Sequence, residues 1–183
     1  MNFKLILLRH PPVDPAWRTK CYGRTDVPLP EDWEYPMLPD GFNPKHVYTS
    51  GMQRCDKVAD LLAVLSLSYF HVDWSLRERN FGDWEGREWD DIHAESGDAM
   101  MGMVTHPESW RPPGGETTFE LRDRVLWWYD GLPKYEGDIL AVTHGGPIAA
   151  LVGTLNDVPV SEWPKLIPKP GAWVEVPLTS RRV

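Results

Sequence analysis

Two stretches decide the fold, and the first is Leu5-Ile6-Leu7-Leu8-Arg9-His10-Pro11-Pro12. The apolar run over residues 3–8 is short and is stopped by two prolines, which is typical of a buried strand. The second stretch has the same form: Asp138-Ile139-Leu140-Ala141-Val142-Thr143-His144-Gly145-Gly146. Each stretch therefore predicts a buried strand with a histidine directly after it.

Strand and helix patterns alternate along the rest of the chain. Further strands are predicted at residues 47–49, 69–73 and 173–176, and a helix is predicted at 147–155. Residues 11–45 are predicted to form a long ordered loop, residues 79–86 a glycine-rich turn region, and residues 87–113 a weakly periodic segment. Strands that alternate with helices indicate an α/β fold, a three-layer α/β/α sandwich with a mainly parallel central sheet.

Two further helices are predicted from apolar stripes. One follows the strand at 47–49, with Ser50 as its N-cap and a stripe of Cys55, Val58, Leu62 and Leu65. The other carries a stripe of Leu121, Val125, Trp128 and Leu132 and is closed by Pro133.

Size and composition limit the functional classes. The 183 residues favour a single domain, 1–183, and 42% hydrophobic residues suffice for a packed core. With 19 Lys and Arg against 27 Asp and Glu, the net charge is −8, which argues against a nucleic-acid binder but not against a small anionic substrate. No stretch approaches a membrane span.

The two cysteines form no disulfide framework and have no metal-site spacing. Because the amino terminus also lacks the pattern of a secretory leader, we expect a cytoplasmic protein that binds no membrane.

The two histidines are the first candidates for chemistry. Ligands of open α/β sheets bind at the carboxyl ends of the strands, so His10 and His144 would lie close together if their strands are neighbours. His46, His71, His93 and His106 have no such context.

Three arginines are placed to join the histidines at a phosphate, since guanidinium groups bind phosphate through paired hydrogen bonds. Arg9 precedes His10, Arg54 lies in the first turns of the helix after the strand at 47–49, and Arg24 lies in the long loop. Taken singly, Arg24, Arg79 and Arg87 are most simply surface charges.

Glu78 follows the strand at 69–73 and is the first candidate for a general acid. Spacing alone leaves Asp83, Glu85 and Glu116 open as alternatives. The chain has no nucleoside triphosphatase loop, no thiolate phosphatase loop and no convincing set of metal ligands. Phosphate chemistry here would therefore use a histidine nucleophile, with no metal and no cofactor.

These segments together resemble the histidine phosphatase superfamily, which includes the cofactor-dependent phosphoglycerate mutases. The similar segments, in chain order, are Leu8-Arg9-His10-Pro11, Ser50-Gly51-Met52-Gln53-Arg54-Cys55, the segment from Leu76 to Gly86, Pro113-Gly114-Gly115-Glu116, and Val142-Thr143-His144-Gly145-Gly146. The resemblance implies a phosphoglycerate-mutase-like fold and a phosphohistidine intermediate.

The resemblance also assigns roles to individual residues. His10 would be the phosphorylated nucleophile, and Glu78 would protonate the leaving oxygen and then activate water. Arg9, Arg54 and His144 would hold the phosphoryl oxygens, with the backbone N–H of Gly145 as a further donor.

Two departures from the family pattern stand out. Pro11 replaces the usual glycine and removes a backbone N–H. A proline-rich stretch around Leu29-Pro30-Glu31-Asp32-Trp33 replaces the usual start of the first helix. We therefore expect a shortened or absent first helix and a differently walled site.

The loop from Cys21 to Leu29 is similar to that of α-ribazole phosphatases, which predicts substrate contacts from Tyr22, Gly23 and Arg24. Trp17, Tyr22 or Trp110 would stack on an aromatic base of the substrate. The partner expected is a small phosphorylated metabolite, and a homodimer is also allowed. A phosphoglycerate mutase and a non-catalytic phosphate-binding module stay open as alternatives.

Overall fold

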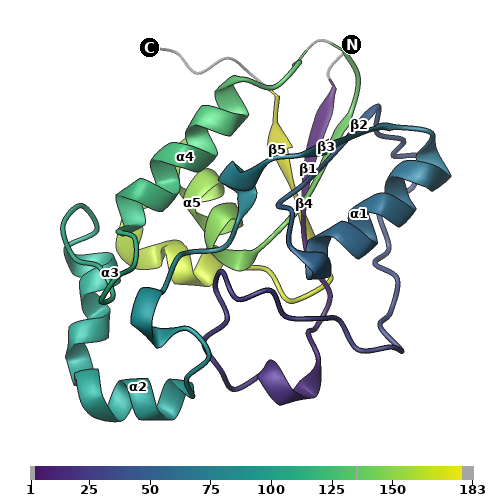
Figure 1. Cartoon of the computed structure of the whole chain (residues 1–183). Coiled ribbons are helices and arrows are strands. Elements are labelled where there is room, and N and C mark those ends of the chain that lie inside the picture. Colours follow the sequence, from purple (N-terminus) through teal and green to yellow (C-terminus); the bar gives the residue numbers. More distant parts are fainter. Residues whose placement is uncertain (1–2, 135, 179–183) are drawn as a thin grey trace.

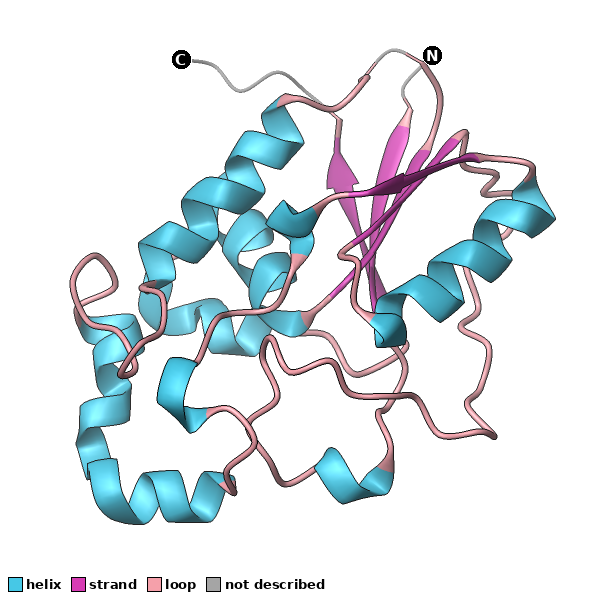
Figure 2. Cartoon of the chain, viewed as in Figure 1, coloured by secondary structure: helices cyan, strands magenta, loops and turns pink. Residues whose placement is uncertain are grey.

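The computed structural model describes residues 3–134 and 136–178, and a five-stranded sheet forms their centre (Figures 1 and 2). The strands run in the order β3-β2-β4-β1-β5 across the sheet. All neighbours are parallel except β5, which pairs antiparallel with β1. The strands are β1 (Lys4–Arg9), β2 (His46–Thr49), β3 (Tyr69–Val72), β4 (Ile139–Thr143) and β5 (Trp173–Pro177).

Helices cover both faces of this sheet. Helix α1 (Gln53–Ser66) lies on one face, and α4 (Thr118–Asp130) and α5 (Gly145–Leu155) lie on the other (Figure 1). Strand β1 alternates between the two cores: Leu5 and Leu7 pack on the α4–α5 side, while Ile6 and Leu8 pack on the α1 side. The predicted three-layer α/β/α sandwich with a mainly parallel sheet is confirmed.

The segments that surround the carboxyl ends of the strands are mostly irregular. Residues 10–45 contain one 3₁₀ turn (Pro15–Trp17) and no α-helix, so the long loop and the missing first helix are confirmed. Residues 87–113 contain helix α2 (Trp89–Ser96), a 3₁₀ turn (Gly97–Met101) and the short helix α3 (Gly102–Thr105). Further 3₁₀ turns lie at Trp74–Leu76, Gly82–Trp84 and Val160–Leu166.

Three details of the helix predictions are wrong. Met52, not Ser50, is the N-cap of α1, and the backbone N–H of Gln53 is bound instead by the carboxylate of Asp26. Leu65 belongs to the exposed face of α1, with 66% of its surface accessible. Leu132 is buried as expected but lies beyond the end of α4, which stops at Asp130.

Helix α4 begins with a reciprocal cap between Thr117 and Glu120, in which each side chain binds the other residue's backbone N–H. Within residues 3–134 and 136–178, no helix has both the length and the apolar character that a membrane crossing needs.

Candidate active site

The pairing of β1 with β4 brings the two predicted histidines together. Arg9 lies opposite Thr143 at the ends of these strands, so His10 and His144 follow on adjacent strand ends. Their ring centroids are 5.3 Å apart, and the rings meet edge to face at 63°. Both side chains are buried. By contrast, His46 and His71 stack on each other elsewhere in the sheet.

The ring of His10 is held in one tautomer. Its Nδ1 lies 2.7 Å from the carbonyl oxygen of Pro11. Because a carbonyl can only accept, Nδ1 carries the proton and donates it, which leaves the lone pair of Nε2 free. Pro11, the residue that departs from the family pattern, thus provides the group that orients the His10 ring.

The charge state of His10 fits the same role. Burial and the nearby Arg54 lower its pKa to about 3, and Arg9 acts in the same direction against the raising effect of the bond to Pro11. The imidazole is therefore neutral at neutral pH, and a neutral ring with a free Nε2 is a nucleophile.

Arg54 is a fully buried cation. Its guanidinium donates to the carbonyl oxygens of Thr25 (2.9 Å), Gly23 (2.7 Å) and Tyr22 (3.3 Å), and lies 5.4 Å from the Tyr22 ring. No carboxylate among the described residues forms an ion pair with it, and its Nε is buried without a partner. A buried charge without a counter-charge is costly, so the site is built for an anion.

Arg9 lies beside the amino terminus of α5. One of its terminal nitrogens donates to the carbonyl oxygen of Pro168 at 2.7 Å, while its Nε is buried and has no partner. A Cβ on Gly145, the first residue of α5, would lie 3.6 Å from the Arg9 guanidinium carbon. The free N–H groups at a helix start favour anions, so Arg9 and Gly145 face the same charge.

His144 is also held neutral in this arrangement. Its Nε2 lies 2.9 Å from the hydroxyl of Ser50 and 3.5 Å from the thiol sulfur of Cys55. Burial, Arg54 and His10 hold its pKa well below the ordinary value. The positive charge of this cluster therefore comes from Arg9 and Arg54. Ser50, predicted as a helix cap and as the start of a family-like segment, is a contact of this histidine.

Glu78 reaches the same helix start from the other side. Its carboxylate accepts from the backbone N–H of Arg79 at 2.8 Å and of Gly146 at 3.2 Å. A Cβ on Gly146 would lie 2.3 Å from a Glu78 oxygen, so a residue without a side chain is needed there. The structure thus brings Glu78 together with His10, His144, Arg9, Arg54 and Gly145 around the start of α5.

The alternative acids are occupied in other ways. Burial would raise the pKa of Glu116, but hydrogen bonds and charge from Arg124, Asn80 and Arg24 together lower it. Glu85 binds the backbone N–H groups of Arg24 and Thr25 and fastens the long loop. Asp83 is exposed.

The predicted substrate-binding loop builds the wall of the site. Tyr22 and Gly23 present their carbonyl oxygens to Arg54, and Arg24 is exposed and pairs with Glu116 at 3.3 Å. Trp17 lies under the Lys20 ammonium at 5.4 Å, and Trp110 packs against Trp84.

Two arginines differ from what their sequence context indicates. Arg79, expected at the surface, is buried and donates to Thr118 and to the carbonyl oxygen of Glu116. Arg124, which sequence reasoning missed, reaches from α4 to Glu116 and to the carbonyl oxygen of Glu78. In the sequence, Arg124 lies beside Val125 of the apolar stripe, a position that an exposed arginine also takes. The sequence pattern therefore does not indicate that Arg124 reaches the site.

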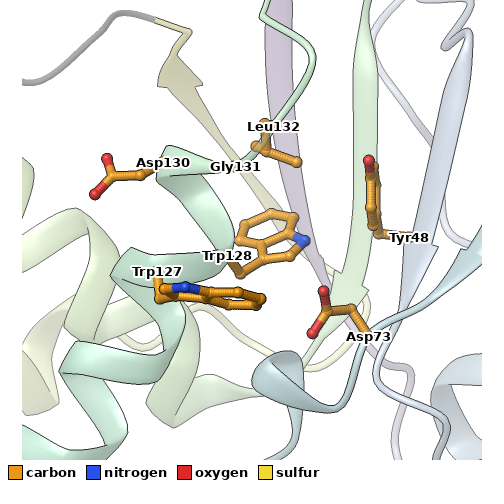
Figure 3. A pocket seen from close by; sticks show the side chains of 7 residues that line it. All are labelled: Tyr48, Asp73, Trp127, Trp128, Asp130, Gly131 and Leu132. Carbon is orange, nitrogen blue, oxygen red and sulfur yellow. The ribbon is translucent and has the colours of Figure 1, made fainter.

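One hollow adjoins this cluster, and another lies away from it. One, of about 320 Å³, is lined by Glu78 and Gly146 and so adjoins the site. The other, of about 390 Å³, lies between β2 and the end of α4 and is lined by Tyr48, Asp73, Trp127 and neighbours (Figure 3). The second hollow includes none of the predicted site residues. No group of three or more His, Cys, Asp or Glu side chains in the described part of the chain could hold a metal ion.

Known proteins that are similar to this chain include a phosphatase and a mutase. Glucosyl-3-phosphoglycerate phosphatase of Mycobacterium tuberculosis is 28% identical over 180 residues, which cover 89% of this chain and 79% of that protein. The 2,3-bisphosphoglycerate-dependent phosphoglycerate mutase of Methylobacterium radiotolerans is 31% identical over 149 residues, covering 78% of this chain and 68% of that protein.

Among solved structures, the α-ribazole phosphatase of Shigella flexneri has a similar fold, with a TM-score of 0.77 at 23% identity over 94% of this chain and 90% of that one. The phosphoglycerate-mutase-like fold is thereby confirmed. The family model described as histidine phosphatase superfamily (branch 1) matches residues 5–183. The chain belongs to the histidine phosphatase superfamily.

Proposed function

We propose that this protein is a metal-independent phosphomonoesterase that forms a phosphohistidine intermediate at His10 and acts on a small phosphorylated metabolite. One observation carries the proposal. Arg54 is fully buried without a counter-charge and keeps a free Nε, and it lies close enough to His10 to lower the pKa of that ring. A phosphate dianion would supply the missing charge beside a neutral nucleophile.

The residues divide the reaction into two steps. Nε2 of His10 attacks phosphorus, and the bond from phosphorus to the ester oxygen breaks as Glu78 gives that oxygen a proton. Water then attacks the phosphohistidine while Glu78 takes a proton from it, which releases phosphate and restores His10. Arg9, Arg54 and the N–H of Gly145 stabilise the phosphoryl oxygens in both steps, with His144 as a neutral hydrogen-bond partner.

Phosphoglycerate mutase is the second candidate, and the 31% identity to a mutase supports it. A mutase would return the phosphoryl group to an organic acceptor instead of giving it to water. Failure of 2,3-bisphosphoglycerate to phosphorylate His10 or to support isomerisation of phosphoglycerate would remove this candidate. A non-catalytic module is disfavoured because the site keeps both a neutral imidazole at His10 and a carboxylate at Glu78.

We propose two candidates for the natural substrate. α-Ribazole 5′-phosphate follows from the loop around Tyr22 and Arg24. Glucosyl-3-phosphoglycerate follows from the mycobacterial relative. A screen of phosphorylated metabolites that contains both compounds would rank them by kcat/KM.

The direct test is release of phosphate from p-nitrophenyl phosphate by the wild type and by His10→Ala. We expect EDTA to leave the wild-type rate unchanged and His10→Ala to lower kcat by about 10⁴-fold or more, as expected for the loss of a nucleophile. The control is His93→Ala, which alters an exposed histidine of α2. Loss of activity with the chelator, or a fully active His10→Ala variant, would refute the mechanism.

A further inference from the structure

The hollow beside Glu78, which we call the apolar pocket, collects side chains from separate parts of the chain. Phe81 and Trp89 contribute from the segment after Glu78, Met100, Met103 and Val104 from the segment around α3, and Ile167 from the carboxyl-terminal part. Its volume is about 320 Å³. Apart from Glu78, the charged and hydroxyl side chains that line it in the described structure are those of Arg79 and Thr118.

These polar groups are engaged with one another. Arg79 donates to the Thr118 hydroxyl at 3.0 Å, and that hydroxyl donates to the carbonyl oxygen of Met103. The charge of Arg79 is faced by Glu78 and Glu116. The apolar pocket therefore offers no uncompensated cation to a carboxylate and few free partners to the hydroxyl groups of a sugar.

The chemistry fixes which part of a substrate meets this pocket. In phosphoryl transfer the attacking and leaving oxygen or nitrogen atoms are roughly in line on opposite sides of phosphorus. With His10 as the nucleophile, the leaving oxygen lies at Glu78. The organic group on that oxygen consequently enters the hollow that Glu78 and Gly146 border.

We propose that the enzyme selects phosphomonoesters whose alcohol has an apolar alkyl or aryl body, and that the apolar pocket holds this body. The selectivity rests on the phosphomonoesterase function proposed above. Met100 and Met103 provide flexible walls, so alcohols of different shapes are accepted as long as they are apolar. Sugar phosphates and 3-phosphoglycerate are poorer substrates because their hydroxyl or carboxylate groups lose water without new partners. The same selectivity disfavours α-ribazole 5′-phosphate and glucosyl-3-phosphoglycerate, both of which carry sugar hydroxyl groups.

Ethyl phosphate and octyl phosphate give a direct test, because both are primary alkyl esters and differ mainly in apolar size. Each methylene group that is buried favours binding by about fourfold. We expect kcat/KM for octyl phosphate to exceed that for ethyl phosphate by about 100-fold or more, allowing for partial burial. Equal values for the two esters, or higher values for glucose 6-phosphate or 3-phosphoglycerate, would overturn the proposal.

A matched pair of variants locates the effect. Met103 lines the apolar pocket, whereas Met101, two residues earlier, does not line it and is 55% exposed. Met103→Asp should lower the octyl-to-ethyl ratio of kcat/KM by about tenfold or more, while Met101→Asp should leave it unchanged. A ratio unchanged in Met103→Asp, or lowered equally in both variants, would overturn the assignment of the pocket.

Met103→Gln, which keeps the side-chain length, repeats the test should Met103→Asp fail to fold as judged by circular dichroism. It should lower the same ratio in the same direction, and an unchanged ratio in this folded variant would refute the proposal.

Phosphorylation of His10 distinguishes a failure of the apolar selectivity from a failure of the proposed phosphohistidine mechanism. If both esters phosphorylate His10 and their kcat/KM values are equal, the phosphatase mechanism stands and the apolar selectivity fails. If neither ester labels His10, the mechanism itself fails.

Discussion

The two sides of Glu78 differ in how they are built. On one side, the phosphate cradle of Arg9, His10, Arg54 and His144 consists of buried polar groups fixed by backbone carbonyls and strand ends. On the other side, the apolar pocket combines buried residues of α4 and α5, such as Leu121 and Ala149, with more exposed side chains from irregular segments, such as Phe81 and Ile167. Under the proposed function, this difference means that the cradle determines the reaction, while the pocket determines which ester undergoes it.

The cradle is rigid because each of its groups has a specific partner. Arg54 needs the carbonyl oxygens of Tyr22, Gly23 and Thr25, and His10 needs that of Pro11. Apolar contacts have no comparable direction, so residues of the pocket can change with less effect on chemistry.

After the loss of His10 itself, the largest effect is expected where the cradle loses its buried guanidinium. Arg54→Lys replaces a guanidinium, which can donate to the loop carbonyl oxygens and to a phosphate at once, by a single ammonium group. We expect it to lower kcat/KM for p-nitrophenyl phosphate by about 10²- to 10³-fold. The control is Arg87→Lys, which alters a surface ion pair with Glu95. Similar rates in the two variants would show that Arg54 does not contact the phosphate.

Glu78→Gln probes the boundary between the two regions. The amide cannot protonate the leaving oxygen, so turnover of octyl phosphate should fall by about 10²-fold. Nitrophenyl phosphate has a good leaving group and serves as the internal control, with a much smaller loss. Equal slowing of both esters would argue against a general acid at this position.

Acidification tests the charge state of the cradle. The pKa of His10 is lowered to about 3, so the folded protein stays unprotonated there while the unfolded chain takes up a proton near 6.5. The contribution of this group to stability is complete above about pH 6.5 and is lost as the pH falls toward 3, at up to about 1.4 kcal/mol per pH unit.

An NMR titration of the His10 ring nitrogens, together with urea unfolding at several pH values, checks this behaviour. A His10 midpoint near 6.5 would contradict the described surroundings.

The smallest effect is expected at Arg24, which the loop resemblance assigns to the substrate. Its side chain is exposed and pairs with Glu116, and exposed pairs contribute about 1 kcal/mol or less. Arg24→Ala should therefore change kcat/KM for p-nitrophenyl phosphate by less than about fivefold. A loss of kcat/KM as large as that of Arg54→Lys would show that Arg24 does contact the phosphate.

The placement of the two histidines of the cradle could be predicted because the sequence shows where a buried strand ends. A short apolar run that stops at a histidine places that histidine at the carboxyl end of a strand. Two such runs on neighbouring strands place His10 beside His144. The acid could not be chosen by spacing alone, since the partners that occupy Glu85 and Glu116 come from distant segments.

The apolar pocket could not be predicted for a physical reason. Leu121 and Ala149 follow the period of their helices, but Phe81, Met100 and Ile167 lie outside the α-helices and strands, so no period indicates that they face the same hollow. They also come from segments as far apart as Phe81 and Ile167. Ser50 was misassigned because a serine shortly before a helix has the pattern of an N-cap, whereas its hydroxyl binds His144.

The central claim is that His10 attacks through Nε2 because Pro11 holds the proton on Nδ1. The most direct measurement is to quench the enzyme during turnover of a phosphomonoester and to identify the phosphorylated atom by ³¹P–¹⁵N NMR. The account predicts an acid-labile phosphoryl group on Nε2 of His10. A phosphoryl group on Nδ1, on another residue, or on no residue would contradict it.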